Sequence, residues 1–401
     1  MRKNVLVLTT CYPLSDTDIS AIFLKSLYEA MAKVVKIRIT ILAADHEDVD
    51  SDFDDKLVKQ GLKVKRYRYF FRRWQTLLYG DAALSNLRKN SFSAFLLIPL
   101  LLSLFIYSIF ELAHGKYSLI HAHWSLPTGL VAVILGKLFH MPVMVTSHGG
   151  DIYGLHGNVS RMLQKWVFSE AEMVNAVSQP VMKEIKLLAP RSHVIVKSMG
   201  VDDDLFSPVS DAKKQLGIAD DSKVLLFVGR FSEKKGVEYL LEATEIIKQK
   251  INNFQILLIG KGNLEKKIRE IIGEKKLQGI VKVLGVVENA RLPIYYSAAD
   301  LLVVPSVADV GGQEGLPVTI MEGLLCGRKI VTTKVGGIVE LSELKSIFFS
   351  EQKNGENLAK VICNALEDKN ILPNESREEG MRFSINKVAA DFIGYYEELL
   401  K

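Results

Sequence analysis

Short runs of apolar, β-branched residues alternate along the chain with helix-length amphipathic stretches. In the first half the apolar runs cover 5–8, 37–42, 119–122 and 142–146. The rhythm restarts in the second half, with runs at 224–228, 255–259, 281–284, 301–304 and 329–332. Buried parallel strands joined by crossover helices produce this pattern. We therefore predict an α/β protein with two doubly wound parallel sheets.

The chain divides near its middle into two halves of similar size. Its 401 residues exceed the length at which one hydrophobic core keeps growing, so two domains with a cleft between them are expected. The polar segment 200–208 ends in Pro208 and separates the two sets of apolar runs, which is typical of a linker. We predict an N-terminal domain over 1–202 and a C-terminal domain over 203–383.

The composition is that of an ordinary folded protein. Apolar residues make up 48% and charged residues 24%, and the net charge of +5 is mild, so neither long disorder nor nucleic-acid binding is indicated. Three widely spaced cysteines predict neither a disulfide framework nor a metal cluster. Residues 1–8 lack the order of a secretory signal. We expect a cytoplasmic protein.

Two neighbouring segments indicate contact with a membrane surface. Segment 63–74 carries six Lys or Arg residues interleaved with aromatic residues, and segment 92–110 is uncharged and apolar enough to be a transmembrane candidate. The predicted strands 5–8 and 119–122 flank that segment in one sheet, so we expect a helix on the sheet or in the membrane interface, not a span. Anionic lipid attracts each cation by about 1 kcal/mol. We predict peripheral binding at the inner face of the cell membrane.

The most informative segment is 305–322, which leaves a predicted strand and enters the next helix. Pro317 suits the first helical position, because it needs no N–H there. The helix would then point its first amides and the positive end of its dipole at the preceding loop, where a diphosphate could bind. The residues that we assign to this phosphate site are Gly311, Gly312, Gly315, Leu316, Pro317 and Val318.

Two carboxylates flank this helix start. Glu314 precedes it and Glu322 lies on its second turn, so one can bind a sugar and the other a ribose. A glycosidase would instead use two carboxylates on either side of one bond. Each residue taken alone also suits an ordinary surface charge. Their spacing together with Gly315 and Pro317 is more specific than either residue.

A second motif supports the first. Arg230 leaves the carboxyl end of the strand 224–228, and Lys235 stands where the following helix begins. Ligands bind at this edge of open α/β sheets, and two cations there would neutralise a diphosphate leaving group without a metal. The alternative is a pair of surface charges near a turn. Residues 260–262 form a lone G-x-G that lacks the rest of a dinucleotide fingerprint, so NAD is not expected.

Histidines in the first half are further candidates. His148 follows the strand 142–146, a position that favours the cleft, although a structural histidine is also possible. Asp151 either orients His148 or caps the next helix. His121 and His123 alternate along a strand, and we expect their side chains to point to opposite faces, so that they share no metal ion.

Together these motifs resemble the family-4 retaining glycosyltransferases of the GT-B fold, and the resemblance covers nearly the whole chain. The matching residues are Glu314, Gly315, Pro317 and Glu322, then Arg230, Lys235 and Gly236, and in the first half the segments 121–124 and 147–151. The first-half segments are typical of members that build cell-surface polysaccharides or glycolipids. The resemblance implies two facing Rossmann-like domains and a C-terminal helix, here 384–401, that returns to the N-terminal one.

The same resemblance implies roles for single residues. Arg230 and Lys235 look like the clamp for the diphosphate of a nucleoside-diphosphate sugar, and Glu322 looks like the ribose ligand. Glu314 would lie beside the sugar ring, and His148 is similar to the histidine that contacts the transferred sugar. The acceptor, a glycan or a lipid-linked glycan, would bind the N-terminal domain. Transfer would retain the anomeric configuration and require neither a protein nucleophile nor a metal or other cofactor.

The chain departs from the family pattern in its first loop. Many members have glycines there that admit phosphate, whereas 10–23 contains none, which puts a phosphate contact from this loop in doubt. The fold alone does not fix the reaction. A sugar-nucleotide epimerase, a sugar phosphorylase, and a catalytically silent subunit that binds nucleotide sugars are therefore the alternatives.

Overall fold

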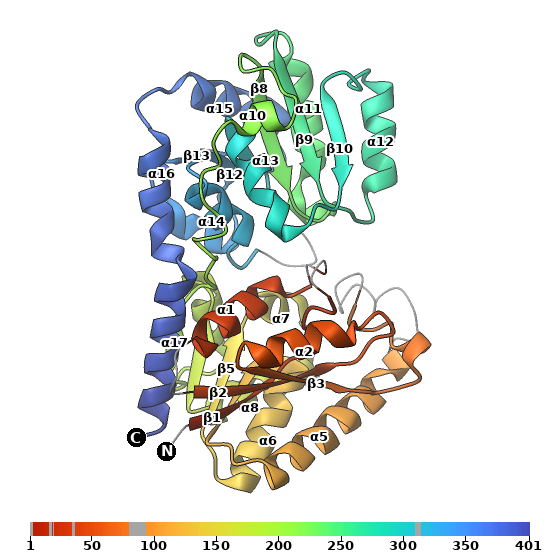
Figure 1. The fold of residues 1–401 in the computed structure, drawn as a ribbon, viewed down its shortest axis with the longest axis vertical. Helices are drawn as coiled ribbons and strands as arrows, with labels where there is room; N and C mark the ends of the chain where they lie inside the picture. The colour runs from red at the N-terminus through yellow and green to blue at the C-terminus, as the bar shows by residue number, and fades with distance from the viewer. Residues whose placement is uncertain (1–2, 16–17, 19, 34–36, 80–93, 309–313) are drawn as a thin grey trace. The chain divides into compact units, whose positions relative to one another are not determined.

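The chain folds into two compact units in the computed structural model, which describes residues 3–15, 18, 20–33, 37–79, 94–308 and 314–401. Unit 1 comprises Met1–Gly200 and Ile385–Lys401, and unit 2 comprises Val201–Ser384 (Figure 1). The boundary falls within the polar segment 200–208. The cleft between the two domains stays a prediction.

Unit 1 contains a seven-stranded parallel sheet in the order β3-β2-β1-β4-β5-β6-β7. Residues of the central strands are fully buried, as two-sided coverage by helices requires. The strands are β1 (Lys3–Leu8), β2 (Ile37–Ala44), β3 (Leu62–Tyr67), β4 (Leu119–His123), β5 (Val143–Ser147), β6 (Met173–Ala176) and β7 (Val194–Val196).

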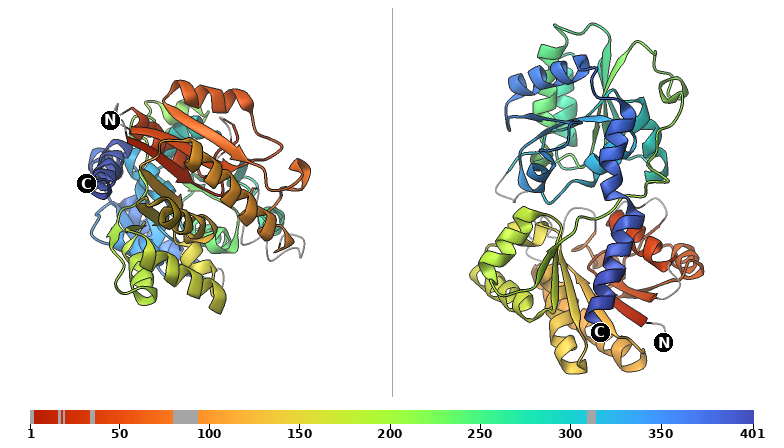
Figure 2. Two further views of the ribbon diagram at one scale, coloured as in Figure 1. Left: turned by 90° about the horizontal axis from the view of Figure 1, so that it is seen from below. Right: turned by 90° about the vertical axis from the view of Figure 1, so that its left-hand side faces the viewer.

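Helices link these strands as crossovers and cover both faces of the sheet (Figure 2). The last helix of the chain packs beside α1, and its Phe392 and Tyr396 are fully buried in the core of unit 1. The helices are α1 (Ile22–Ala32), α2 (Ser51–Lys59), η1 (Arg72–Trp74), α5 (Leu97–His114), η2 (Ser125–Gly129), α6 (Leu130–Phe139), α7 (Gly150–Gly154), α8 (Asn158–Glu170), α9 (Gln179–Leu188) and α17 (Ile385–Leu399).

Unit 2 contains a six-stranded parallel sheet in the order β10-β9-β8-β11-β12-β13. Two apolar clusters form its core. The strands are β8 (Lys223–Val228), β9 (Phe254–Ile259), β10 (Val281–Gly285), β11 (Leu301–Val304), β12 (Lys329–Thr333) and β13 (Ile347–Ser350). The helices are α10 (Ala212–Gln215), η3 (Glu233–Lys235), α11 (Val237–Ile247), α12 (Glu265–Glu274), η4 (Asn289–Arg291), α13 (Leu292–Ala298), α14 (Val318–Leu325), η5 (Gly336–Leu341), α15 (Gly355–Glu367), α16 (Pro373–Gly380) and η6 (Met381–Phe383).

The strand order confirms the predicted fold class of two doubly wound parallel sheets. In each sheet the chain first adds strands on one side of its first strand and then crosses over to add strands on the other side. The reversal lies between β1 and β4 in unit 1 and between β8 and β11 in unit 2. Open α/β sheets bind ligands outside the carboxyl ends of the strands at this switch point. The fold therefore singles out the loops after β1, β4, β8 and β11.

The apolar segment 92–110 contributes a helix that packs on the sheet of unit 1. Within the described residues, α5 is the helix long and apolar enough to cross a membrane. Its neighbours in sequence, β3 and β4, belong to the same parallel sheet, as expected for a crossover helix. One face of α5 is buried through Leu100, Leu104 and Leu112, while the opposite face is exposed.

Close approach between loops requires glycine at the switch point of unit 2. Gly236 has a φ of +65°, and a Cβ there would lie 2.0 Å from the carbonyl oxygen of Pro305, which follows β11. Gly217 has a similar φ of +66° but nothing within 4 Å of its Cβ position. The two glycines therefore share a backbone conformation and differ in their surroundings.

We predict that Gly236→Ala destabilises unit 2 much more than Gly217→Ala. The left-handed conformation costs each alanine about 1–2 kcal/mol, and only at position 236 must backbone also move away from the new methyl group. Urea unfolding of both variants measures the difference in free energy of unfolding. Equal losses would show that the loops after β8 and β11 do not pack as described.

Candidate functional site

The loops after β8 and β11 bring the two motifs of unit 2 together. Arg230 and Lys235 follow β8, and Glu314 follows β11, the strand that pairs with β8 in parallel. The backbone confirms this proximity, because the Val307 amide donates to the carbonyl oxygen of Lys234 over 2.9 Å. The predicted residues Gly311 and Gly312 lie outside the described residues.

Lys235 and Glu314 form an ion pair. The Nζ of Lys235 lies 3.0 Å from Oε1 of Glu314, and Glu314 is only 8% exposed. Burial raises the pKa of the Glu314 carboxyl, but the ammonium groups of Lys235 and Lys234 outweigh it and leave the pKa below its ordinary value. Glu314 is therefore a carboxylate at neutral pH.

Glu322 occupies a different environment from Glu314. It is buried in α14, and the hydroxyl of Tyr296 from α13 donates to its Oε2 over 2.6 Å. Burial raises the pKa of Glu322 to about 7, although the Tyr296 hydrogen bond opposes the shift. The two glutamates are thus held by different partners, and Tyr296 is a site residue that no local sequence motif had indicated.

Helix α14 begins one residue later than predicted. Pro317 is its N-cap with an extended ψ of 123°, and Val318 is the first helical residue. Pro317 therefore lies just outside the helix. The first amides of the helix, those of Val318 and Thr319, have no acceptor within the helix and follow the partly buried residues Gly315 and Leu316.

Arg230 is exposed beside this loop system. It follows Gly229, and its carbonyl oxygen accepts the Ser232 amide over 3.0 Å. Arg230 thus follows the carboxyl end of β8, on the same loop as Lys235. Together with the α14 amides, these groups make the switch point of unit 2 attractive to an anion.

Unit 1 presents a histidine at the same kind of edge. His148 follows β5, and its ring lies near three aromatic rings, with centroid distances of 5.1 Å to Phe23, 4.9 Å to Trp124 and 5.2 Å to His123. Burial lowers the pKa of His148 to about 3. The imidazole is therefore neutral and offers hydrogen bonds instead of charge.

His148 ends a buried chain of hydrogen bonds that begins in the last helix. Its Nε2 lies 3.0 Å from Nδ1 of His123, whose Nε2 contacts the Tyr28 hydroxyl. That hydroxyl lies 3.1 Å from Nδ1 of His121, which also contacts the hydroxyl of Tyr396 over 2.7 Å. The network fixes the His148 ring from one side and links it to α17.

The expectation that His121 and His123 point to opposite faces was wrong. Residues i and i+2 of a strand lie on one face, and the two ring centroids are 4.4 Å apart. The pattern H-x-H on a strand therefore indicates a pair of neighbouring rings. Among the described residues, no group of three or more His, Cys, Asp or Glu side chains could hold a metal ion.

The Asp151 carboxylate accepts hydrogen bonds from two backbone amides and one hydroxyl. It makes no hydrogen bond to the His148 ring or to the N-cap of α7. Its Oδ1 accepts the His148 amide over 3.2 Å and the Ser147 hydroxyl over 2.9 Å, and its Oδ2 accepts the Ser125 amide over 2.7 Å. The N-cap of α7 is Gly149, without a side-chain cap. Asp151 therefore joins the loops after β4 and β5 and places the His148 backbone.

Comparisons with known proteins agree on one family. A family model described as glycosyltransferase family 4 matches residues 36–205, and one described as glycosyl transferases group 1 matches residues 209–383. Between them the two models cover both units.

Individual relatives add to these matches. An uncharacterized glycosyltransferase of Methanocaldococcus jannaschii is 25% identical over 303 residues, 70% of this chain and 75% of the relative. An amylovoran biosynthesis glycosyltransferase of Erwinia amylovora is 31% identical over 231 residues, and the match spans 54% of each chain. The crystal structure of Anabaena HepE in complex with UDP aligns with a TM-score of 0.74 at 18% identity, covering 99% of this chain and 100% of that one. This likeness confirms the GT-B fold.

Acid should destabilise unit 1 through its buried histidines. Burial lowers the pKa of His121 and of His148 from 6.5 to about 3, and it lowers that of His123 well below its ordinary value. Between about pH 6.5 and 3 the unfolded chain binds protons that the folded unit does not, so stability falls as pH falls, by up to ~1.4 kcal/mol per pH unit and histidine.

Urea unfolding at several pH values, followed by hydrogen exchange in unit 1, tests this prediction. His121→Gln should flatten the dependence by about one proton, whereas Gln at the exposed His114 should not. An unchanged slope in His121→Gln would mean that His121 is protonated in the folded protein.

Proposed function

The chain belongs to the glycosyltransferases described by these two family models, and from that premise we propose that it transfers a sugar from a nucleoside-diphosphate donor with retention at the anomeric carbon. The observation that carries this proposal is the Lys235–Glu314 ion pair at the switch point of unit 2. It places a cation and a buried carboxylate at one sheet edge, and the carboxylate lies just before the N-terminus of α14.

Unit 2 suits a pyrophosphate with a sugar on one side and a nucleoside on the other. Arg230, Lys235 and the amides of α14 supply positive potential for the diphosphate. Glu314 is ionised and close to Lys235, so its carboxylate can accept hydrogen bonds from sugar hydroxyls. Glu322, held by Tyr296, is proposed to accept the ribose hydroxyls. The complex of HepE with UDP supports a nucleotide donor by analogy of fold.

The proposed reaction breaks the bond between the anomeric carbon and the diphosphate oxygen. The acceptor hydroxyl attacks on the face from which the diphosphate leaves, and its proton passes to the departing phosphate. Negative charge therefore builds up on the diphosphate, where fixed cations stabilise it more in the transition state than in the ground state. In this proposal Arg230 and Lys235 provide the neutralisation that a metal ion supplies elsewhere.

His148 is proposed to bind the transferred sugar as a neutral group. A protonated imidazole would repel the positive charge that develops on the sugar ring, whereas a neutral one donates or accepts a hydrogen bond without that penalty. Burial keeps it neutral, and the contact with Nδ1 of His123 holds the ring in place. Asp151 would act indirectly, by placing the His148 backbone.

We place the acceptor in unit 1 and the reaction in the synthesis of a cell-surface polysaccharide or glycolipid. The amylovoran biosynthesis relative supports this setting, and we propose a glycan or lipid-linked glycan as acceptor. The enzyme would work in the cytoplasm at the inner face of the membrane, where nucleotide sugars and lipid-linked intermediates meet.

The exposed side of α5 supports attachment to that membrane. Phe95 and the helix residues Ile98, Leu102, Ile106 and Phe110 are each 55–63% exposed and recur every three or four positions, so they form one stripe, the α5 face. A helix that presents such an apolar stripe outward suits the interface between lipid headgroups and acyl chains.

Aromatic and basic side chains extend the α5 face at one end. The ring of Phe70 lies 6.2 Å from that of Phe95 and stacks on Trp74 at 5.8 Å, and the exposed Phe71 joins the same group. Arg73 lies 5.1 Å from the Trp74 ring centroid. Aromatic rings and arginines of this kind gather at the level of anionic headgroups.

Loss of the Lys235 ammonium should abolish most donor turnover. We expect Lys235→Ala to lower the hydrolysis of UDP-, GDP- or ADP-sugars by about 10²–10³-fold, the usual effect of removing one group that stabilises developing charge. Lys266→Ala, at a lysine with a 90% exposed side chain in the same unit, is the matched control. Equal rates in wild type and Lys235→Ala would discard the assigned role. Retention is read from the anomeric configuration of the product by NMR.

Charge on the α5 face should release the protein from membranes. Leu102→Glu with Ile106→Glu is expected to weaken binding to phosphatidylglycerol vesicles by at least ~10-fold, since each buried side chain contributes roughly 1.5–3 kcal/mol. Leu187→Glu, at a 76% exposed leucine on α9, is the control and should bind as wild type does. Unchanged binding of the double variant in a flotation assay would remove the α5 face from the proposal.

A further inference from the structure

A cavity of about 430 Å³ opens at the carboxyl ends of β2 and β3 in unit 1. Asp45 follows β2, Arg68 and Arg72 follow β3, and Tyr107 belongs to α5. Arg66, Arg68 and Arg72 line the cavity together with Asp45. The donor proposal uses none of these charged side chains, and the three arginines belong to the basic segment 63–74.

The guanidinium groups of Arg68 and Arg72 share one buried carboxylate. Nε of Arg68 lies 3.2 Å and Nε of Arg72 2.9 Å from Oδ2 of Asp45, and Nη2 of Arg72 lies 2.9 Å from Oδ1. Asp45 is 5% exposed, whereas the arginine side chains are 57% and 45% exposed. Burial raises the pKa of Asp45, but the two arginines hold it below its ordinary value. One positive charge therefore remains uncompensated within the trio.

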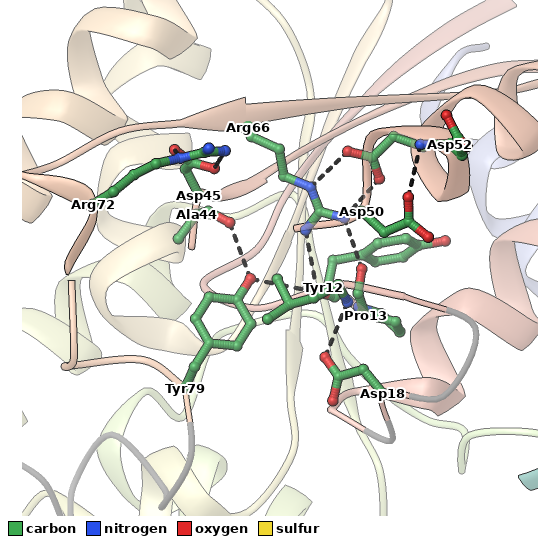
Figure 3. Close-up of polar contacts among 12 residues, drawn as sticks. Tyr12, Pro13, Asp18, Ala44, Asp45, Asp50, Asp52, Arg66, Arg72 and Tyr79 are labelled. Carbon is green, nitrogen blue, oxygen red and sulfur yellow. Dashed lines mark hydrogen bonds and ion pairs between the residues drawn. The ribbon is translucent and has the colours of Figure 1, made fainter. Parts of the chain in front are cut away.

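Arg66, which lines the same cavity, has a structural role. It donates to both oxygens of Asp54 and to the carbonyl oxygens of Tyr12 and Pro13 (Figure 3). These contacts fix the loop after β1 against β3. Arg68 and Arg72 differ from Arg66, because their side chains are 57% and 45% exposed whereas that of Arg66 is 9% exposed.

Helix α5, which carries the α5 face, also lines this cavity. Tyr107 lines it from α5, and the hydroxyl of Ser103 donates to the Arg68 carbonyl oxygen over 2.7 Å. Lys65 of β3 pairs with Glu111 near the end of the same helix. An anion between the two arginines would therefore lie beside an apolar surface that leads away from it.

We propose that this cavity binds the phosphate of a lipid-linked acceptor, with the two arginines on the phosphate and the apolar chain along α5. Guanidinium groups match phosphate oxygens bidentately. The inference rests on the proposed function, since it names the acceptor class of that reaction. His148 lies three strands away on the same edge, roughly 14 Å from the strand of Asp45, and the glycan of the acceptor spans that distance.

Calorimetric titration of the full chain with three probes tests the proposal. Farnesyl diphosphate carries both anion and chain, inorganic pyrophosphate carries only the anion, and farnesol carries only the chain. We expect farnesyl diphosphate to bind at least ~10-fold tighter than either of the others, because both parts of the site contribute. Equal binding of pyrophosphate and farnesyl diphosphate would overturn the lipid assignment.

Variants locate the bound probe. Arg68→Gln and Arg72→Gln are combined with Asp45→Asn, so that no buried carboxylate loses its partners. This triple variant should bind farnesyl diphosphate at least ~10-fold more weakly than wild type, while Arg191→Gln, at an exposed arginine of the same unit, should bind it as wild type does. Unchanged affinity in the triple variant would overturn the proposal.

The donor site provides the second control. Lys235→Ala should keep the farnesyl diphosphate affinity of wild type, because that lysine lies in unit 2. Loss of affinity in Lys235→Ala, with full affinity in the triple variant, would assign the probe to the donor site and overturn the inference. The titration needs no turnover, so its outcome is separate from that of the donor-hydrolysis assay.

Discussion

The structure of the candidate site depends on one ion pair, between the buried Glu314 and the partly exposed Lys235. Lys235 and Glu314 come from loops that follow neighbouring parallel strands, and each makes the charge of the other tolerable away from water. Removing Lys235 would leave the buried Glu314 carboxylate without this counter-charge. The pair therefore holds the loops after β8 and β11 in register and keeps a cation where a diphosphate can reach it.

Unit 1 presents neutral groups at its candidate site. Its switch-point edge carries three histidines whose pKa values are depressed by burial, and hydroxyl groups of Tyr28 and Tyr396 complete their hydrogen bonds. A neutral network suits contact with a sugar, whereas the ionised site of unit 2 suits a diphosphate. The division of labour that we propose between acceptor and donor units follows from this contrast.

The sequence predicted the fold because the spacing of the apolar residues and the length of each apolar run can be read from it directly. Nine apolar runs located nine of the thirteen strands among the described residues, and the motifs around Lys235 and Glu314 lay at strand ends, where parallel sheets place ligands. Strand β3 was missed because the exposed Lys63 and the charges of Lys65 and Arg66 mask its buried Leu62 and Tyr67. Partners that come from distant segments, such as Tyr296 for Glu322 and Tyr28 for His123, leave no local signal.

We propose that the loops after β8 and β11 hold the donor diphosphate, and a structure of the protein with a bound nucleoside-diphosphate sugar tests this binding site. We expect phosphate oxygens within hydrogen-bond distance of Lys235 Nζ and of the first amides of α14, with the ribose at Glu322. A diphosphate bound away from both loops, with the Lys235–Glu314 pair undisturbed, would contradict it.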